Sequence, residues 1–170
     1  NNREQARAGN RDPGAAPHGA YLCSGNDRWL AIGCFSDQHW EGLQRTIAPD
    51  GKGWPYKPDC ATLLSRKANE DELDHLLTGW TSSWEVGALM ETLQSAGVPA
   101  GMVNDCRDLF EDAQLQHRGH FQWLDHPEIG PYATDTSEMV LSLSPGSLDT
   151  PCPLYTSDAA DDTIRGDLAG

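Results

Sequence analysis

The sequence is poor in positive charge. Its 170 residues hold 12 Lys and Arg against 26 Asp and Glu, which gives a formal net charge of −14. Nucleic-acid binding needs clustered cations that displace counterions, and an anionic membrane surface attracts the same cations. The charge balance therefore argues against a nucleic-acid partner and against binding to an anionic membrane.

Long apolar runs are also absent. None approaches the roughly 18 residues of a transmembrane helix, so we expect no membrane span. The first seven residues include no Met and no apolar core of a signal peptide. They are typical of a helix interior, and we expect a chain cut within a longer protein.

Cysteines show no pairing pattern. There are five of them, an odd number, and no two are spaced Cys-x-x-Cys. Reduced thiols in a cytoplasmic protein fit this pattern better than a disulfide framework. The five are Cys23, Cys34, Cys60, Cys106 and Cys152.

Glycine and proline are plentiful near the N-terminus. Residues 9–19 form a Gly- and Pro-rich loop, and an apolar segment follows at residues 20–23. Residues 24–27, Ser-Gly-Asn-Asp, are turn formers because they tolerate positive φ and bond their own backbone. With the apolar run 29–35, this predicts a flexible loop joined to one end of a hairpin. An ordinary surface loop fits the same residues.

Apolar spacing then predicts helices. Ser36 and Asp37 can cap the first, on which Trp40, Leu43 and Ile47 share one face.

Two further helices are predicted to pack as a pair. Asn69 with Glu72 has the spacing of a capping box, and Ser82 with Glu85 repeats it. A strand at residues 100–104 follows the second helix. The two apolar faces are Leu73, Leu76, Leu77 and Trp80, then Val86, Leu89, Met90 and Leu93.

The next part of the chain predicts two short helices and a hairpin. Asp105 or Asp108 can cap the first helix, and Asp112 starts the second. Residues 120–125 and 138–143 alternate apolar and polar side chains loosely, and we expect them to pair as strands.

Histidines suggest an alternative of another class, a non-catalytic metal-binding or interaction module. His117 and His120 are three residues apart, with Asp125 and His126 near. Gly119 interrupts any helix between the first two, and no Cys joins them. We therefore predict no metal site.

An ordered series of motifs resembles the class III CoA-transferases of the CaiB/BaiF type over about residues 7–154. Each motif is weak alone, and the order is what is specific. The motifs are the 9–19 loop with residues 27–32 (Asp-Arg-Trp-Leu-Ala-Ile), 40–43 (Trp-Glu-Gly-Leu), 80–81 (Trp-Thr), 97–101 (Gly-Val-Pro-Ala-Gly) and 112–119 (Asp-Ala-Gln-Leu-Gln-His-Arg-Gly).

The resemblance implies an α+β fold, a small antiparallel sheet with packed helices. It implies four parts: residues 1–19, the end of a large-domain segment with a lid loop; 20–118, the small domain; 119–154, a hairpin returning to the large domain; and 155–170, a non-native tail. The tail is set apart because residues 154–161 resemble a translated sequencing adapter, although a natural acidic tail has a similar composition.

The resemblance also implies a reaction. Family members move CoA between an acyl-CoA thioester and a carboxylic acid through an aspartyl anhydride and an enzyme–CoA thioester. No cofactor is implied, since CoA is a substrate. The nucleophilic Asp is expected upstream of residue 1, so no catalytic residue is assigned here and the piece alone should be inactive. The full-length protein is expected to be an interlocked, cytoplasmic homodimer.

The site residues carried over are those of the lid. Some transferases have a run of glycines there, whereas this chain has one central glycine, which leaves open how far the loop moves and which acid is used. Arg3, Arg7 and Arg11 are candidates for holding CoA phosphates. An α-methylacyl-CoA racemase of the same fold is an alternative, with His and Asp/Glu bases instead of an anhydride. The lid residues are Gly14, Ala15, Ala16, Pro17, His18 and Gly19.

Overall fold

The computed structural model describes residues 7–137, 139, 141–144, 146 and 148. The chain divides into two compact units, Asn1–Val103 and Asn104–Gly170. The expected mid-helix start at residues 1–6 and the expected non-native tail lie outside the described residues. The two short helices that follow residue 103 belong to the second unit, and the predicted parts 1–19, 20–118 and 119–154 stay a prediction.

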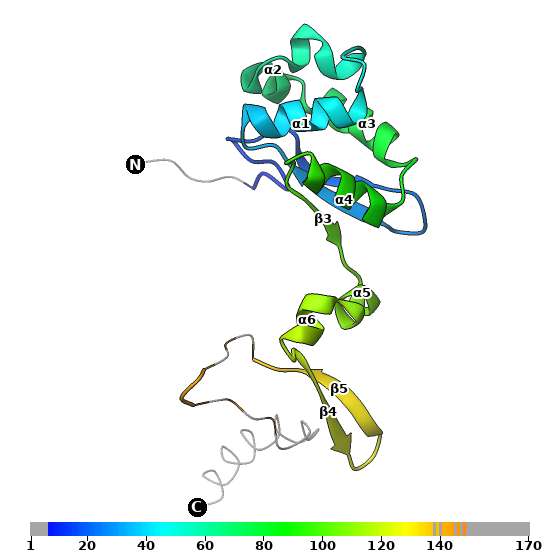
Figure 1. Cartoon of the computed structure of the whole chain (residues 1–170), viewed down its shortest axis with the longest axis vertical. Helices are drawn as coiled ribbons and strands as arrows, with labels where there is room; N and C mark the ends of the chain where they lie inside the picture. The colour runs from blue at the N-terminus through cyan, green and yellow to red at the C-terminus, as the bar shows by residue number, and fades with distance from the viewer. Residues whose placement is uncertain (1–6, 138, 140, 145, 147, 149–170) are drawn as a thin grey trace, which may run out of the picture. The chain divides into compact units, whose positions relative to one another are not determined.

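The first unit is built on a three-stranded antiparallel sheet (Figure 1). Its strands are β1 (His18–Leu22), β2 (Trp29–Gly33) and β3 (Ala100–Val103), in the order β1-β2-β3. Asp27, with a φ of 53°, and Gly25, with a φ of 109°, turn the chain between β1 and β2. The predicted hairpin and the predicted third strand are therefore confirmed.

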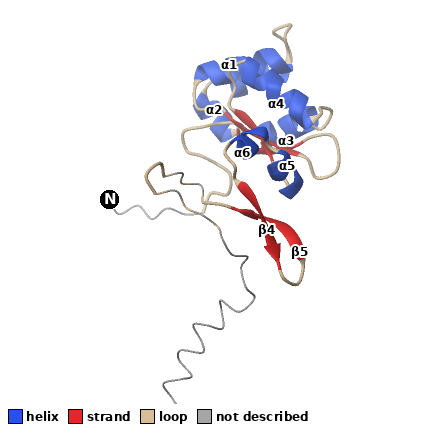
Figure 2. Ribbon diagram, turned by 60° about the horizontal axis from the view of Figure 1, so that its bottom comes forward, coloured by secondary structure: helices blue, strands red, loops and turns tan. Residues whose placement is uncertain are grey.

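Helices cover one face of this sheet and bury the core (Figure 2). α3 packs on β1, and α4 packs on β2 and β3. Tyr21, Leu30 and Ile32 are buried toward them. The helical elements are α1 (Asp37–Ile47), η1 (Trp54–Tyr56), η2 (Pro58–Cys60), α2 (Leu63–Ala68), α3 (Glu70–Thr81) and α4 (Val86–Ser95).

The caps of these helices only partly follow the prediction. Ser36 caps α1 as expected, because its hydroxyl accepts from the backbone N–H of His39. The predicted capping box at Asn69 is wrong, since the Asn69 amide donates to the Ser65 carbonyl instead. Ser82 ends α3, and Glu85 alone caps α4.

The second unit contains α5 (Cys106–Glu111), α6 (Ala113–His117) and a hairpin of β4 (Phe121–His126) with β5 (Gly130–Asp135). Asp105 and Asp108 cap α5 together in a capping box, and Asp112 caps α6. The predicted partner strand 138–143 is wrong. β5 lies closer, because Gly130 has a φ of 76° and lets the chain reverse directly after β4. Residues 138 and 140 lie outside the described residues.

The structure is α+β, as predicted, with small antiparallel sheets and several helices. Within the described part of the chain, no helix has the length and apolar character needed to cross a membrane.

Candidate functional site

The first half of the predicted lid is a tight, buried turn, here called the 12–17 turn. The Asp12 carboxylate accepts from the Gly14 N–H at 2.7 Å, and the Asp12 carbonyl accepts from the Ala15 N–H at 3.4 Å. Ala15 and Ala16 are 0% exposed, and Pro17 is also buried after a cis peptide bond. This turn differs from the flexible loop that the sequence predicts.

Helix α2 holds the turn through two neighbouring cations. Arg66 Nε donates to the Ala16 carbonyl at 2.8 Å, and Lys67 Nζ donates to the Asp12 carbonyl at 2.8 Å. On the other side, the backbone N–H of Cys34 donates to the Pro17 carbonyl at 2.8 Å. Both ends of the turn are therefore bonded to the body of the first unit.

A groove of about 840 Å³ lies on the sheet face that the helices leave uncovered. Small residues form its floor, because Ala20 pairs with Ala31 and Ala31 pairs with Gly101 across the three strands. The residues that rise around this floor include Asn10, Arg11, His18, Phe35, Pro99 and Val103.

One wall of the groove combines an imidazole and an aromatic ring. The rings of His18 and Phe35 meet edge to face, with centroids 5.3 Å apart. His18 Nδ1 also lies at hydrogen-bond distance from the Asn10 carbonyl. Phe35 is 55% exposed, so this wall presents an open apolar surface.

The predicted lid residues therefore divide into two groups. His18 and Gly19 line the groove, whereas Gly14 is exposed at the 12–17 turn. Ala15, Ala16 and Pro17 are buried beneath it. Only the C-terminal end of the predicted segment, His18 and Gly19, therefore reaches the groove.

Arg11, one of the three arginines predicted to hold CoA phosphates, is paired with carboxylates in the structure. Its guanidinium is bonded to the Asp71 carboxylate and lies 3.8 Å from that of Glu70 and 3.9 Å from that of Asp74. The bond to Asp71 raises the pKa of Arg11. Arg7 is described and exposed, and Arg3 lies outside the described residues. Acidic residues of α3 thus compete with any phosphate for Arg11.

No carboxylate lines the groove among the residues that the structure describes. Cys34, whose backbone N–H donates to Pro17, does not line the groove, and burial raises the pKa of its thiol to about 12. Cys34 is thus a protonated apolar residue at neutral pH. The groove offers the imidazole of His18, the guanidinium of Arg11, the amide of Asn10 and backbone groups, which suit binding and orientation.

Sequence reasoning missed Arg66, which is 1% exposed. Its guanidinium lies over the Trp40 ring at 4.8 Å from the ring centroid, and Nη1 donates to the Cys60 carbonyl at 3.2 Å. Burial lowers the pKa of Arg66. Nothing in the local pattern separates Arg66 from the solvated arginines of a short helix, because its partners are distant in sequence.

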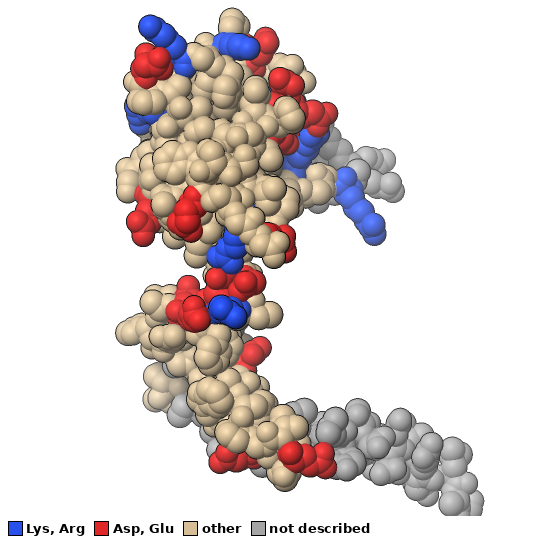
Figure 3. All heavy atoms as spheres, turned by 90° about the vertical axis from the view of Figure 1, so that its right-hand side faces the viewer, with Lys and Arg blue, Asp and Glu red and all other residues tan. Residues whose placement is uncertain are grey.

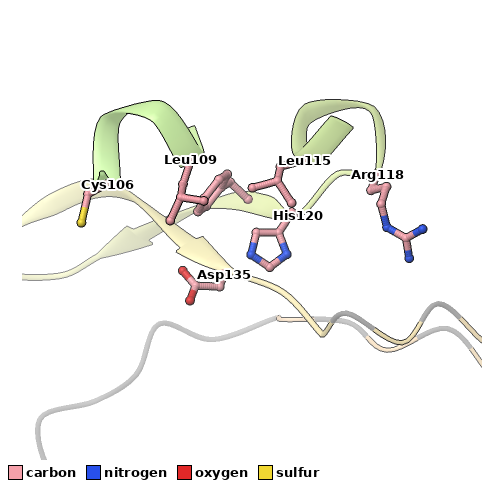
Figure 4. A pocket seen from close by; sticks show the side chains of 7 residues that line it. Cys106, Leu109, Leu115, Arg118, His120 and Asp135 are labelled. Carbon is pink, nitrogen blue, oxygen red and sulfur yellow. The ribbon is translucent and has the colours of Figure 1, made fainter. Parts of the chain in front are cut away.

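A second hollow, of about 720 Å³, lies within the second unit (Figure 4). Cys106 and Arg118 lie at opposite ends of it, and His120 and Asp135 lie between them. No three potential metal ligands come together in the described segments. The ring nitrogen Nδ1 of His126, one of the histidines considered as ligands, instead accepts from the Glu128 N–H at 3.1 Å.

Acidic side chains are scattered over both units in the space-filling view, and no broad basic surface appears on that face (Figure 3). This agrees with the acidic composition of the chain.

Comparison with known proteins gives a consistent result. The sequence model of the family described as CoA-transferase family III matches residues 1–159. A protein named probable CoA-transferase Rv1866, from Mycobacterium tuberculosis (strain ATCC 25618 / H37Rv), is 32% identical over 153 residues, which are 86% of this chain and 18% of that protein. The formyl-CoA:oxalate CoA-transferase of Rhodopseudomonas palustris (strain TIE-1) is 30% identical over 142 residues, 82% of this chain and 33% of that enzyme.

A solved structure shares the fold. The crystal structure of a CAIB/BAIF family protein from Brucella suis matches 98% of this chain with a TM-score of 0.73 and 28% identity, and the match covers 41% of that chain. The chain thus spans less than half the length of these similar proteins.

Proposed function

The chain belongs to CoA-transferase family III, and on that premise we propose that it is part of an enzyme that moves CoA between an acyl-CoA thioester and a carboxylic acid. The observation that carries the proposal is the groove on the uncovered sheet face, with His18 and Gly19 at its edge. The proposed role of this chain is to supply one wall of the substrate site.

The proposed reaction needs a carboxylate nucleophile. It attacks the thioester carbonyl carbon, which forms an anhydride and releases CoA as the thiolate. The thiolate attacks the enzyme's carbonyl carbon of the anhydride, which gives an enzyme–CoA thioester and frees the donor acid. The acceptor carboxylate then reverses both steps. The lack of a carboxylate among the described lining residues supports a nucleophilic Asp outside this chain.

Water must be kept from such intermediates, because anhydrides and thioesters hydrolyse. The groove has apolar walls at Phe35 and Val103 and a floor of Ala and Gly. These residues give close, dry contact with an acyl or pantetheine chain once the rest of the enzyme covers them. Of the predicted lid residues Gly14, Ala15, Ala16, Pro17, His18 and Gly19, we propose that His18 and Gly19 make the contact, since these two line the groove.

The racemase alternative requires an imidazole and a carboxylate facing the same α-carbon. The groove supplies His18, and no carboxylate accompanies it among the described residues that line the groove. Because the transferase also needs a carboxylate that is not among these lining residues, the groove does not separate the two reactions. The similar proteins are named CoA-transferases, which favours the transferase, and no observation on the described residues favours a metal-binding module.

We also propose that the full-length protein is a cytoplasmic homodimer whose remaining parts cover the open surfaces of this chain. Trp123 is 66% exposed, and Phe110 contacts it with ring centroids 6.3 Å apart. Such an exposed aromatic cluster is unusual for a free surface. A partner surface in the longer protein explains it.

The experiment uses the 170-residue chain with succinyl-CoA and a carboxylic acid acceptor. We expect no exchange of CoA between acids, measured by chromatography of the thioesters. We expect succinyl-CoA to shift the backbone NMR signals of Gly19, Gly33 and Gly101 in the groove, with Gly79 on α3 as the unshifted reference. Turnover by this chain alone would contradict the external nucleophile, and shifts confined to other surfaces would contradict the groove.

A further inference from the structure

We propose that Arg66, assisted by Lys67, is a positioning residue that fixes the 12–17 turn from α2 and so sets the place of His18 at the groove. The role of the groove in substrate binding rests on the proposed function. The anchoring of the turn does not, and the two are tested separately below.

Arg66 is buried and depends on carbonyl partners for its charge. A guanidinium that is 1% exposed needs hydrogen-bond partners, because an unpaired buried charge is very costly. Its guanidinium donates to two backbone carbonyls, that of Ala16 at 2.8 Å and that of Cys60 at 3.2 Å. The carboxylate of Asp37 is 3.8 Å away and largely exposed, so it contributes little. The Ala16 carbonyl is thus a principal partner of this cation.

An arginine side chain fits the site of Arg66, whereas a lysine side chain does not. The planar guanidinium stacks on Trp40 while separate nitrogens reach two carbonyls in different segments. A lysine ammonium is compact and has no plane to stack. Replacement of Arg66 by Lys therefore keeps the charge and loses the geometry.

Lys67, the next residue, also contacts the turn. Its ammonium donates to the Asp12 carbonyl at 2.8 Å and to the Glu70 carboxylate at 2.6 Å. Lys67 thus holds the start of the turn while Arg66 holds its end. The chain that leaves the turn at Pro17 enters β1 at His18, which meets Asn10 from before the turn.

The consequence is that the 12–17 turn does not open as a lid. Opening would break the bonds from Arg66 and Lys67 and leave a buried cation without a main partner. A fixed turn holds His18 in one place, and fixed geometry is what a reaction between bound groups requires.

The test is amide hydrogen exchange of the 170-residue chain with Arg66→Lys. The matched control is Arg45→Lys on α1, where the side chain is 63% exposed and its carboxylate partner is 3.9 Å away. We expect exchange at Ala15 and Cys34, whose N–H groups donate to the turn, to rise at least about tenfold. Exchange at Val98, in the α4–β3 connection, should change less than about twofold.

A second readout is the imidazole of His18. In Arg66→Lys we expect its ¹⁵N signals to move, whereas Arg45→Lys should leave them in place. If Arg66→Lys fails to fold, Lys67→Gln tests the other anchor, and faster exchange at Ala15 with Val98 unchanged is the expected result. Equal acceleration at Ala15, Cys34 and Val98, or no acceleration at Ala15 and Cys34, would overturn the inference.

Succinyl-CoA titration separates this inference from the proposed function. If succinyl-CoA does not shift Gly19 in the unsubstituted chain, the proposed function fails, and the exchange results still decide the role of Arg66. If it does, we expect Arg66→Lys to reduce the shift at Gly19. An undiminished shift at Gly19 would contradict the positioning role and leave the proposed function standing.

Discussion

Gly42 and Gly79 allow one helix contact of the first unit to be tested with a matched pair of alanine substitutions. Both glycines lie inside helices, Gly42 in α1 and Gly79 in α3. A Cβ on Gly42 would lie 2.5 Å from the backbone oxygen of Ala96 and 3.0 Å from Cγ2 of Val98, whereas a Cβ on Gly79 meets nothing within 4 Å. Only the first substitution therefore disturbs packing.

The magnitudes follow from two opposing terms. Alanine in place of glycine stabilises a helix interior by about 1 kcal/mol at either position. At Gly42 the obstacle is a backbone atom at the end of α4, which cannot move aside as a side chain does, so we take the upper part of the usual overpacking cost, about 2–3 kcal/mol. We therefore expect Gly42→Ala to lower the free energy of unfolding by about 1–2 kcal/mol and Gly79→Ala to raise it by about 0.5–1 kcal/mol.

Urea unfolding followed by tryptophan fluorescence measures both effects. With an m-value of about 1.5 kcal/mol/M, Gly42→Ala should lower the midpoint by about 1 M, and Gly79→Ala should raise it by about 0.5 M. A Gly42→Ala protein as stable as the unsubstituted chain would show that α1 and α4 do not approach at this point. A destabilised Gly79→Ala would show that the outer face of α3 is covered.

Three other predictions concern buried or capping groups. Tyr21→Phe removes the bond from the Tyr21 hydroxyl to the Asp74 carboxylate, 2.7 Å long, and should lower the free energy of unfolding by about 1–2 kcal/mol in urea titrations. Backbone N–H groups lower the pKa of the capping carboxylate of Glu85. The charged carboxylate therefore stabilises the fold at neutral pH, and this stabilisation is lost as pH falls through the lowered pKa. Measured by thermal unfolding, the difference in stability between the unsubstituted chain and Glu85→Gln should shrink between about pH 5 and about pH 3. Cys34 is buried, whereas Cys106 is exposed. A thiol reagent at neutral pH should therefore label Cys106 in the folded chain and Cys34 only after denaturation, as read by peptide mass spectrometry.

Local signals predicted the elements whose causes are local. Ser36 caps α1 because its hydroxyl reaches an N–H three residues on, and Gly97 ends the α4 segment with a φ of 79°. Leu73 and Leu77 are buried as their spacing predicts. These features depend on a few neighbouring residues, which the sequence displays directly.

The errors arise where residues had a choice of partners. Asn69 has the right spacing to cap α3, yet its amide donates backward to Ser65 because α2 ends at that point. The strand partner of β4 was predicted at residues 138–143 because their alternation suggests a strand. The chain instead turns at Gly130, and β5 pairs with β4 from the residues beside that turn onward, His126 opposite Gly130.

The anchored turn shows why composition alone misjudges a loop. One glycine and two prolines suggest freedom, but the Cβ atoms of Ala15 and Ala16 and the ring of Pro17 are buried, so opening would expose apolar area that a glycine run lacks. The departure from glycine therefore stabilises the closed turn, and Arg66, 50 residues along the chain from Ala16, completes the anchor.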